Sequence, residues 1–225
     1  MEKVKTLCIV QARVGSTRLP GKVLKTIGGK TLLETHLERA LKSKKITKLK
    51  VATTIEAGAD EIVTIANKLG VGSFNGSIND VLERFYLCAL SENPDYVVRL
   101  TSDCPLIDPL EIDKVIGKCI MGKYDYVANT LELTFPDGMD VEIFTFSALR
   151  IAYQKAVSKS DREHVTPYIR RNSSVKGGKM FSSFSVRYPE DFSRYRLTVD
   201  TQEDFNLIKN LIIHLGANKN WLDYV

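Results

Sequence analysis

The sequence of 225 residues lacks long hydrophobic runs, paired cysteines and a strong excess of one charge. Its longest apolar stretches, 7–10 and 211–213, are far too short to cross a bilayer, and no secretion signal is visible. The four cysteines lie far apart without a CxxC pair, which argues against a zinc knuckle or a disulfide framework and fits a reducing cytoplasm. A net charge of +5 argues against wholesale nucleic-acid binding, so we expect neither a nucleic acid nor a membrane as partner.

What the chain does have is the composition of a globular protein and an alternating pattern of strands and helices. Hydrophobic residues make up 44% and charged residues 26% of the chain, and no linker divides it, so we expect one domain over 1–225. Strands are predicted at 6–10, 48–53, 71–74, 96–100, 124–128, 141–146, 181–187 and 195–199. Helices are predicted at 31–41, 60–69, 80–90, from Asp108-Pro109 onward, from a capping box at 160–163 to about 171, and at 203–215. This alternation predicts an α/β fold with a parallel sheet covered by helices.

In such a sheet, ligands bind beyond the carboxyl ends of the strands, where loops converge and helix amino termini point. A loop at 11–30 follows the first strand and carries the cations Arg13, Arg18 and Lys22, with flexible glycines and hydroxyl groups between them. Guanidinium forks, an ammonium group and loop amides suit a polyphosphate, although neither a Walker loop nor a GxGxxG motif is present. The alternative for this segment is a basic surface loop.

Two aspartates follow predicted strands at the same edge. Asp103 comes directly after the strand at 96–100, and Asp200 comes after the one at 195–199. Each could simply cap a helix or form a turn, but two carboxylates opposite a cationic loop favour a Mg²⁺ ion held together with substrate phosphates.

The segment 12–22 resembles the nucleotide-binding loop of the cytidylyltransferases that activate acidic sugars, such as the CMP-Kdo and CMP-sialate synthetases. It is most similar to the branch named after the spore coat polysaccharide biosynthesis protein SpsF. Further motifs match that branch in order at 76–85, 101–108, 138–142, 163–168 and 198–201. The resemblance therefore covers nearly the whole chain.

The resemblance implies a Rossmann-like nucleotide-diphospho-sugar transferase fold, with a mostly parallel central sheet and helices on both faces. It also implies a small extension or arm at about 131–189, which would form a dimerisation arm or an acceptor subregion. It implies transfer of CMP from CTP to an acidic sugar or phosphorylated small molecule, with release of pyrophosphate, by a homodimer that uses Mg²⁺ in surface polysaccharide or glycoconjugate synthesis. The nucleotide-binding residues would be Ala12, Arg13, Ser16, Arg18, Lys22, Gly76 and Asp80, and the region 76–84 would lie near the nucleoside. Arg13, Lys22 and Asp103 would be catalytic, Asp103 and Asp200 would hold the metal, and Asp140, Glu142 and His164 would face the acceptor.

The acceptor residues have structural alternatives. Asp140 and Glu142 alternate with apolar residues and could form the exposed face of a strand, and His164 could be a surface histidine on a helix. Arg99, at the sheet edge, could meet a substrate anion or pair with Asp103. His36 and His214 are interpreted as structural.

Rival functions are a uridylyl- or thymidylyltransferase acting on a sugar phosphate and a catalytically silent nucleotide-binding assembly partner. The absence of any Asp-x-Asp motif argues against a glycosyltransferase.

Overall fold

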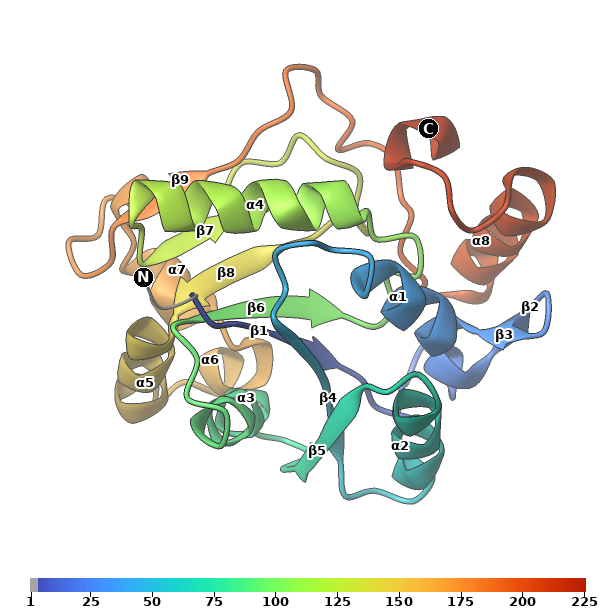
Figure 1. Cartoon of the computed structure of the whole chain (residues 1–225), viewed down its shortest axis with the longest axis horizontal. Helices are drawn as coiled ribbons and strands as arrows, with labels where there is room; N and C mark the ends of the chain where they lie inside the picture. Colours follow the sequence, from blue (N-terminus) through green and yellow to red (C-terminus); the bar gives the residue numbers. More distant parts are fainter. Residues whose placement is uncertain (1–3) are drawn as a thin grey trace.

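The protein is described by a computed structural model that covers residues 4–225, and its centre is a twisted sheet with helices on both faces (Figure 1). The strands are β1 (Thr6–Gln11), β2 (Thr26–Ile27), β3 (Lys30–Thr31), β4 (Lys48–Thr54), β5 (Gly72–Gly76), β6 (Tyr96–Thr101), β7 (Tyr126–Ala128), β8 (Glu142–Thr145) and β9 (Ser183–Ser185). The α-helices are α1 (Leu32–Ala40), α2 (Ala59–Lys68), α3 (Val81–Leu90), α4 (Pro109–Gly122), α5 (Phe146–Lys155), α6 (Lys159–His164), α7 (Pro167–Arg171) and α8 (Gln202–Leu215). Short 3₁₀ turns lie at Lys22–Leu24, Ser174–Lys176 and Trp221–Tyr224.

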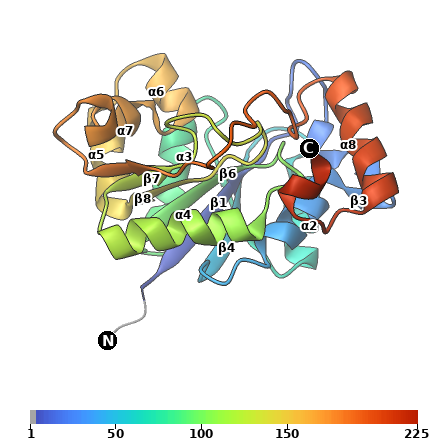
Figure 2. The ribbon, with the colours of Figure 1, turned by 90° about the horizontal axis from the view of Figure 1, so that it is seen from above.

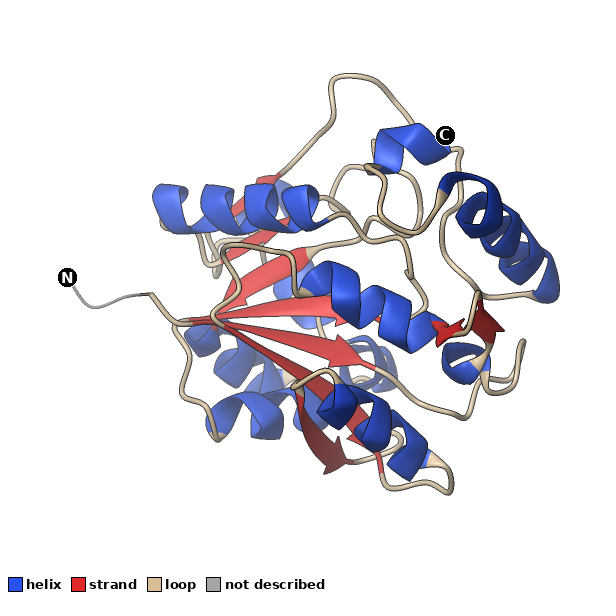
Figure 3. Cartoon of the chain, turned by 45° about the vertical axis from the view of Figure 1, so that its right-hand side comes forward, coloured by secondary structure: helices blue, strands red, loops and turns tan. Residues whose placement is uncertain are grey.

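The sheet has the strand order β5-β4-β1-β6-β8-β7-β9. Strands β5, β4, β1 and β6 are parallel neighbours, whereas β8 runs antiparallel between β6 and β7. The predicted mostly parallel sheet is therefore confirmed, and Figure 3 shows its strands fanning out between the two helical layers. Because β1, β4, β5 and β6 all end at the same edge, the loops after them meet there.

Alternation along β1 divides the interior into two cores. Cys8 and Val10 face the core beneath α1, α2 and α4, and Leu7 and Ile9 face the core beneath α3, α5 and α7. All four side chains are buried. A strand with apolar residues on both faces must be covered on both sides, which is the arrangement seen from above in Figure 2.

Helix starts follow the local sequence. Thr31 begins α1 with a capping box completed by Glu34, and Asp108 caps α4 with Pro109 in its first turn, as predicted. The box predicted at 160–163 is wrong, because Ser158 is the cap and accepts from the Asp161 amide. The single helix predicted to 171 is also wrong: Val165 has a φ of 68° and separates α6 from α7.

The strand predicted at 195–199 is wrong. This segment does not join the sheet, and its β-type pairing is an isolated bridge between Asp137 and Arg196. The apolar residues Leu197 and Val199 are nevertheless buried, because they pack in the larger core. The Val199 amide donates to the Asp103 carbonyl, which brings the following Asp200 beside Asp103.

Helix α5 and the β2–β3 hairpin are not predicted from the sequence. The segment 131–189 supplies β8, β9 and α5 to α7, so much of it belongs to the sheet and its covering layer. The one-domain division and the dimerisation arm stay predictions. No helix in the described part of the chain is long and apolar enough to span a membrane.

Candidate active site

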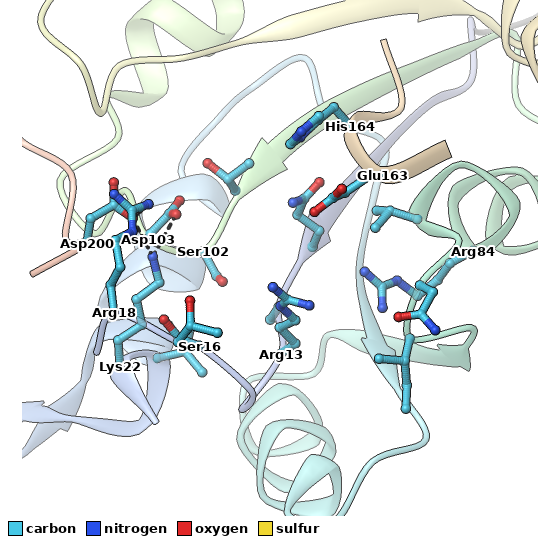
Figure 4. A pocket seen from close by; sticks show the side chains of 18 of the residues that line it. Arg13, Ser16, Arg18, Lys22, Arg84, Ser102, Asp103, Glu163, His164 and Asp200 are labelled. Atoms are coloured by element: carbon cyan, nitrogen blue, oxygen red, sulfur yellow. Dashed lines mark hydrogen bonds and ion pairs between the residues drawn. The ribbon is translucent and has the colours of Figure 1, made fainter. Parts of the chain in front are cut away.

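A crevice of about 700 Å³ opens at the carboxyl ends of β1 and β6 (Figure 4). A volume of this size accommodates a nucleotide-sized ligand. Its lining comes from five parts of the chain: the loop after β1, the start of α3, the turn after β6, α6, and the turn before α8. The residues of the first three parts are Gln11, Ala12, Arg13, Ser16, Thr17, Arg18, Lys22, Val23, Ile78, Asn79, Val81, Arg84, Thr101, Ser102 and Asp103, and they are joined by Lys159, Arg162, Glu163, His164 and Asp200.

Four charged side chains meet at one end of this crevice. The Lys22 ammonium donates to Asp103 Oδ2 and Asp200 Oδ1, both at 2.9 Å, and to the Val199 carbonyl at 2.8 Å. Arg18 Nη2 also lies 2.9 Å from Asp200 Oδ1. The expectation that loop cations meet the carboxylates is confirmed for Lys22, which contacts both, and for Arg18, which contacts Asp200; Lys22 is 13% exposed and Arg18 is 65% exposed.

The charges in this cluster perturb one another. Burial lowers the pKa of Lys22, but the charge of Asp103 and hydrogen bonds to both carboxylates outweigh burial and leave that pKa raised. Burial raises the pKa of Asp103, and the Lys22 ammonium outweighs it and leaves that pKa lowered. Both groups are therefore held in their charged forms, as a binding site for phosphate and metal requires.

The loop after β1 is held in place from outside the crevice. Glu56, which follows β4, accepts from the amides of Val14 and Gly15, both at 3.1 Å. A side chain at Gly15 would collide with this carboxylate, because an added Cβ would lie 2.7 Å from Glu56 Oε2. These two amides are thus occupied by Glu56, and the cationic side chains are left to contact an anion.

Arg13 and Arg84 lie at the middle and the opposite end of the crevice (Figure 4). Arg13 makes no hydrogen bond or ion pair with its side chain to residues 4–225, and Arg84 is buried without a carboxylate partner there. Burial, together with the charge of Arg13, lowers the pKa of Arg84 to about 10.

Two residues predicted to bind the nucleotide support the crevice without lining it. Asp80 caps α3 by accepting from the Glu83 amide and pairs with Arg162 of α6, whose Nε lies 2.8 Å away. Gly76 leaves room for the stem of Arg84, since an added Cβ would lie 3.1 Å from Arg84 Cγ. Their predicted contact with the nucleotide stays a prediction.

Three of the predicted acceptor residues, Arg99, Asp140 and Glu142, also lie outside the crevice lining. Glu142 is buried and accepts from Arg99 Nη1 at 2.6 Å and Tyr126 Oη at 2.5 Å, so it is not on an exposed strand face. Arg99 pairs with Glu142 instead of Asp103, and its Nε donates to Gln11 Oε1, which does line the crevice. Antiparallel pairing of β8 with β6 places Arg99 opposite Glu142.

Asp140 is partly buried near other acids. Burial raises its pKa to about 7, and the carboxylates of Asp137 and Glu142 reinforce the effect.

Two of the histidines lie in different environments. His164 lines the crevice beside Glu163. His36 is buried, and its Nδ1 lies 2.8 Å from the Cys104 carbonyl, which fits the structural role predicted for it.

Sequence reasoning missed Glu56, Lys159 and Arg162, none of which lies in a motif matched to the family. Arg84 belongs to the region that the resemblance places near the nucleoside, and it lines the crevice. Among residues 4–225, no cluster of three or more acids, histidines or cysteines could hold a metal alone. A divalent ion here would need phosphate oxygens beside Asp103 and Asp200.

The sequence model of the family described as cytidylyltransferase matches residues 7–224. The chain belongs to the cytidylyltransferase family. This cytidylyltransferase is 35% identical over 217 residues to the spore coat polysaccharide biosynthesis protein SpsF of Bacillus subtilis, a match that covers 93% of the chain and 87% of SpsF.

Its fold is that of solved relatives. A cytidylyltransferase from Leptospira borgpetersenii superposes with a TM-score of 0.91 at 38% identity, covering 99% of this chain and 92% of that one. The 8-amino-3,8-dideoxy-manno-octulosonate cytidylyltransferase of Shewanella frigidimarina is 33% identical over 119 residues, which is 51% of this cytidylyltransferase and 47% of the relative. The predicted family and fold are therefore confirmed, and the chain is a nucleotidyltransferase.

Proposed function

We propose that the protein transfers CMP from CTP to the hydroxyl group of an acidic sugar, with release of pyrophosphate, for surface polysaccharide synthesis. The observation that carries this proposal is the meeting of Lys22 and Arg18 with Asp103 and Asp200 at one end of the crevice. An acidic sugar is supported by the similarity to the Shewanella enzyme, and polysaccharide synthesis by the similarity to SpsF.

In this reaction the acceptor oxygen attacks the α-phosphorus in line, a P–O bond forms, and the bond to the bridging oxygen breaks as pyrophosphate leaves. The hydroxyl proton passes to solvent, and no covalent enzyme intermediate is needed. Arg13, Arg18 and Lys22 would bind the triphosphate and offset the charge that moves onto the leaving group. Positioning and charge neutralisation account for most of the rate.

We further propose that Asp103 and Asp200 hold Mg²⁺ when the nucleotide is bound. The Lys22 ammonium supports this proposal. It contacts one oxygen of each carboxylate at 2.9 Å, so the two carboxylates lie close enough together to bind a single cation. Mg²⁺ is usually held by one or two carboxylates together with substrate phosphates. When bound, the ion would neutralise phosphate oxygen charge.

A screen of pyrophosphate release tests the proposal. It crosses the four ribonucleoside triphosphates with eight-carbon and nine-carbon acidic sugars and phosphorylated acceptors, with and without Mg²⁺. We expect release only from CTP with an acidic sugar and Mg²⁺, and loss of at least 100-fold in rate in D103A and D200A, on the order of what charge-stabilising groups contribute. Full Mg²⁺-dependent release by both variants would refute the assignment.

A further inference from the structure

Gln11, the last residue of β1, lines the crevice with an amide group whose orientation is fixed by a neighbouring strand. Its Oε1 accepts a hydrogen bond from Arg99 Nε at 3.2 Å. A guanidinium group has donors and no acceptor, so the atom that faces Arg99 must be the amide oxygen. The Nε2 group of Gln11 therefore points away from Arg99, and within the described part of the chain it donates to no other group.

The arginine that fixes Gln11 is itself held by a buried carboxylate. Arg99 Nη1 donates to Glu142 Oε2 at 2.6 Å, and the two side chains are 16% and 6% exposed. Glu142 also accepts from Tyr126 Oη at 2.5 Å and from Thr166 Oγ1 at 3.1 Å. With three donors around it, this buried carboxylate is satisfied without a ligand. Glu142 is therefore placed to hold Arg99 and does not itself need to contact a substrate.

The strand register brings these polar side chains together. Gln11 lies two residues beyond Ile9 on β1, so both side chains point to the same face of the sheet. Arg99 of β6 is paired with Ile9 of β1 on one side and with Glu142 of β8 on the other. A polar row thus crosses three neighbouring strands at the edge of an apolar face. Such a row is costly unless it is hydrogen-bonded, and here it brings the free donor of Gln11 to the crevice.

The position of this donor selects the substrate that it would meet. Under the proposed function the triphosphate lies on Arg18 and Lys22, and the acceptor must lie beside it to reach the α-phosphorus. Thr166, which contacts Glu142, follows His164 by two residues, so the polar row is on the side of the crevice formed by α6, away from Lys22 (Figure 4). A fixed N–H donor suits an oxygen atom without a hydrogen, and on an acidic sugar the strongest such partner is the carboxylate.

Resting on the proposed function, we propose that Gln11 binds the carboxylate of the acidic sugar through Nε2, and that Arg99 and Glu142 are positioning residues that prevent the amide from turning over. If the amide turned over, it would present its oxygen to the sugar, and that oxygen repels a carboxylate. The arrangement selects an acid over a neutral acceptor of the same shape, because only the acid offers a charged partner to the fixed donor.

Matched acceptors test this assignment. Kdo and N-acetylneuraminate are each compared with their carboxamides in pyrophosphate release, with CTP and Mg²⁺, by the full-length wild type and Q11E. Q11E keeps an oxygen for Arg99 but replaces the Nε2 donor by a second oxygen. We expect the acid-to-amide ratio of kcat/KM to fall by about 10- to 100-fold, the usual value of a hydrogen bond to a charged group. The Kd of CTP, measured by calorimetry, should change little.

R99K tests the positioning role. Lysine keeps a cation beside Glu142 but lacks the Nε donor, so the Gln11 amide becomes free to turn over. The acid-to-amide ratio should fall by a smaller factor than in Q11E, because the amide still presents Nε2 part of the time. A merely structural defect would lower the rates with both acceptors equally and leave the ratio unchanged. R99K also keeps the assignment testable if Q11E does not fold.

The control for the added charge is Q154E, the same substitution at an exposed position of α5, which should leave the ratio unchanged. An unchanged ratio in Q11E overturns the assignment, and an unchanged ratio in R99K overturns the positioning role. If Q11E weakens CTP as much as it slows transfer to the acid, Gln11 contacts the nucleotide and the assignment is overturned as well. Failure of the proposed function looks different, because the wild type would then release no pyrophosphate with either acid, and the inference would fall with it.

Discussion

Replacing Lys22 by methionine tests the charge cluster that the proposed function depends on. Lys22 donates to Asp103, Asp200 and the Val199 carbonyl, all within 2.9 Å, and is 13% exposed. Methionine preserves most of the side-chain volume but removes the ammonium group. The two carboxylates would then face each other with only Arg18 and Arg196 nearby, both largely solvated.

The expected cost follows from the burial of the cluster. Removing one partner of a buried ion pair costs about 3–5 kcal/mol, and the carboxylates keep some exposure, so we expect about 3 kcal/mol. For a chain of this length each kcal/mol shifts Tm by about 2–4 °C, which gives a fall of about 6–12 °C. K30M is the matched control, because Lys30 pairs with Glu38 at the surface and should cost less than about 1 kcal/mol.

The pH dependence gives the prediction a sign. In the wild type Lys22 keeps the pKa of Asp103 low. The ionised Asp103 carboxylate therefore stabilises the fold at neutral pH, and this stabilisation is lost in acid. In K22M burial dominates and the pKa of Asp103 should rise, so the variant gains stability as the pH falls from 7 toward 5. Urea unfolding at pH 5 and pH 7.5 measures both effects. A K22M protein as stable as wild type, with the same pH dependence, would refute the electrostatic reasoning.

Three further predictions concern residues around the crevice. E142Q should lose about 2–3 kcal/mol of unfolding free energy, because the charge of Arg99 loses its buried partner; unchanged stability in urea would contradict this. E56A should raise the Kd for CTP about 10-fold in calorimetry, because the amides of Val14 and Gly15 lose the carboxylate that accepts their hydrogen bonds and the loop becomes less ordered. An unchanged Kd would show that Glu56 is not needed to order the loop. D140N should be more stable than wild type at pH 8, and this advantage should shrink steadily as the pH falls from 7 toward 4. Because the pKa of Asp140 is raised to about 7 in the folded protein, unfolding of the wild type releases a proton in this pH range; scanning calorimetry in EDTA measures the effect, and equal Tm values at pH 8 would contradict it.

The central sheet was predictable because its signals are local. The apolar run of β1 and the cap of α4 depend on neighbouring residues, and both predictions were confirmed. The segment 195–199 misled because apolar residues buried in a core look the same in sequence whether or not the segment joins the sheet. Alternation also could not tell which side of β8 would be buried, since the partners of Glu142 lie on distant segments.

The site was predictable where several charges share a short loop or follow a strand. Lys22, Asp103 and Asp200 were found in this way, and the structure brings them into contact. Glu56 was missed because it is a lone charge, and only folding shows that it holds the amides of the loop. Arg84 was placed near the nucleoside by the resemblance alone, and only folding shows that its Nε is buried without a partner. Their importance comes from burial and distance, neither of which leaves a pattern in the sequence.

The most direct test of the central claim is a crystal structure with CTP and Mn²⁺ in place of Mg²⁺. The account predicts an anomalous Mn²⁺ peak within coordination distance of both Asp103 and Asp200, with the triphosphate on Arg13, Arg18 and Lys22. Triphosphate bound away from this loop, or a metal peak that touches neither aspartate, would contradict it.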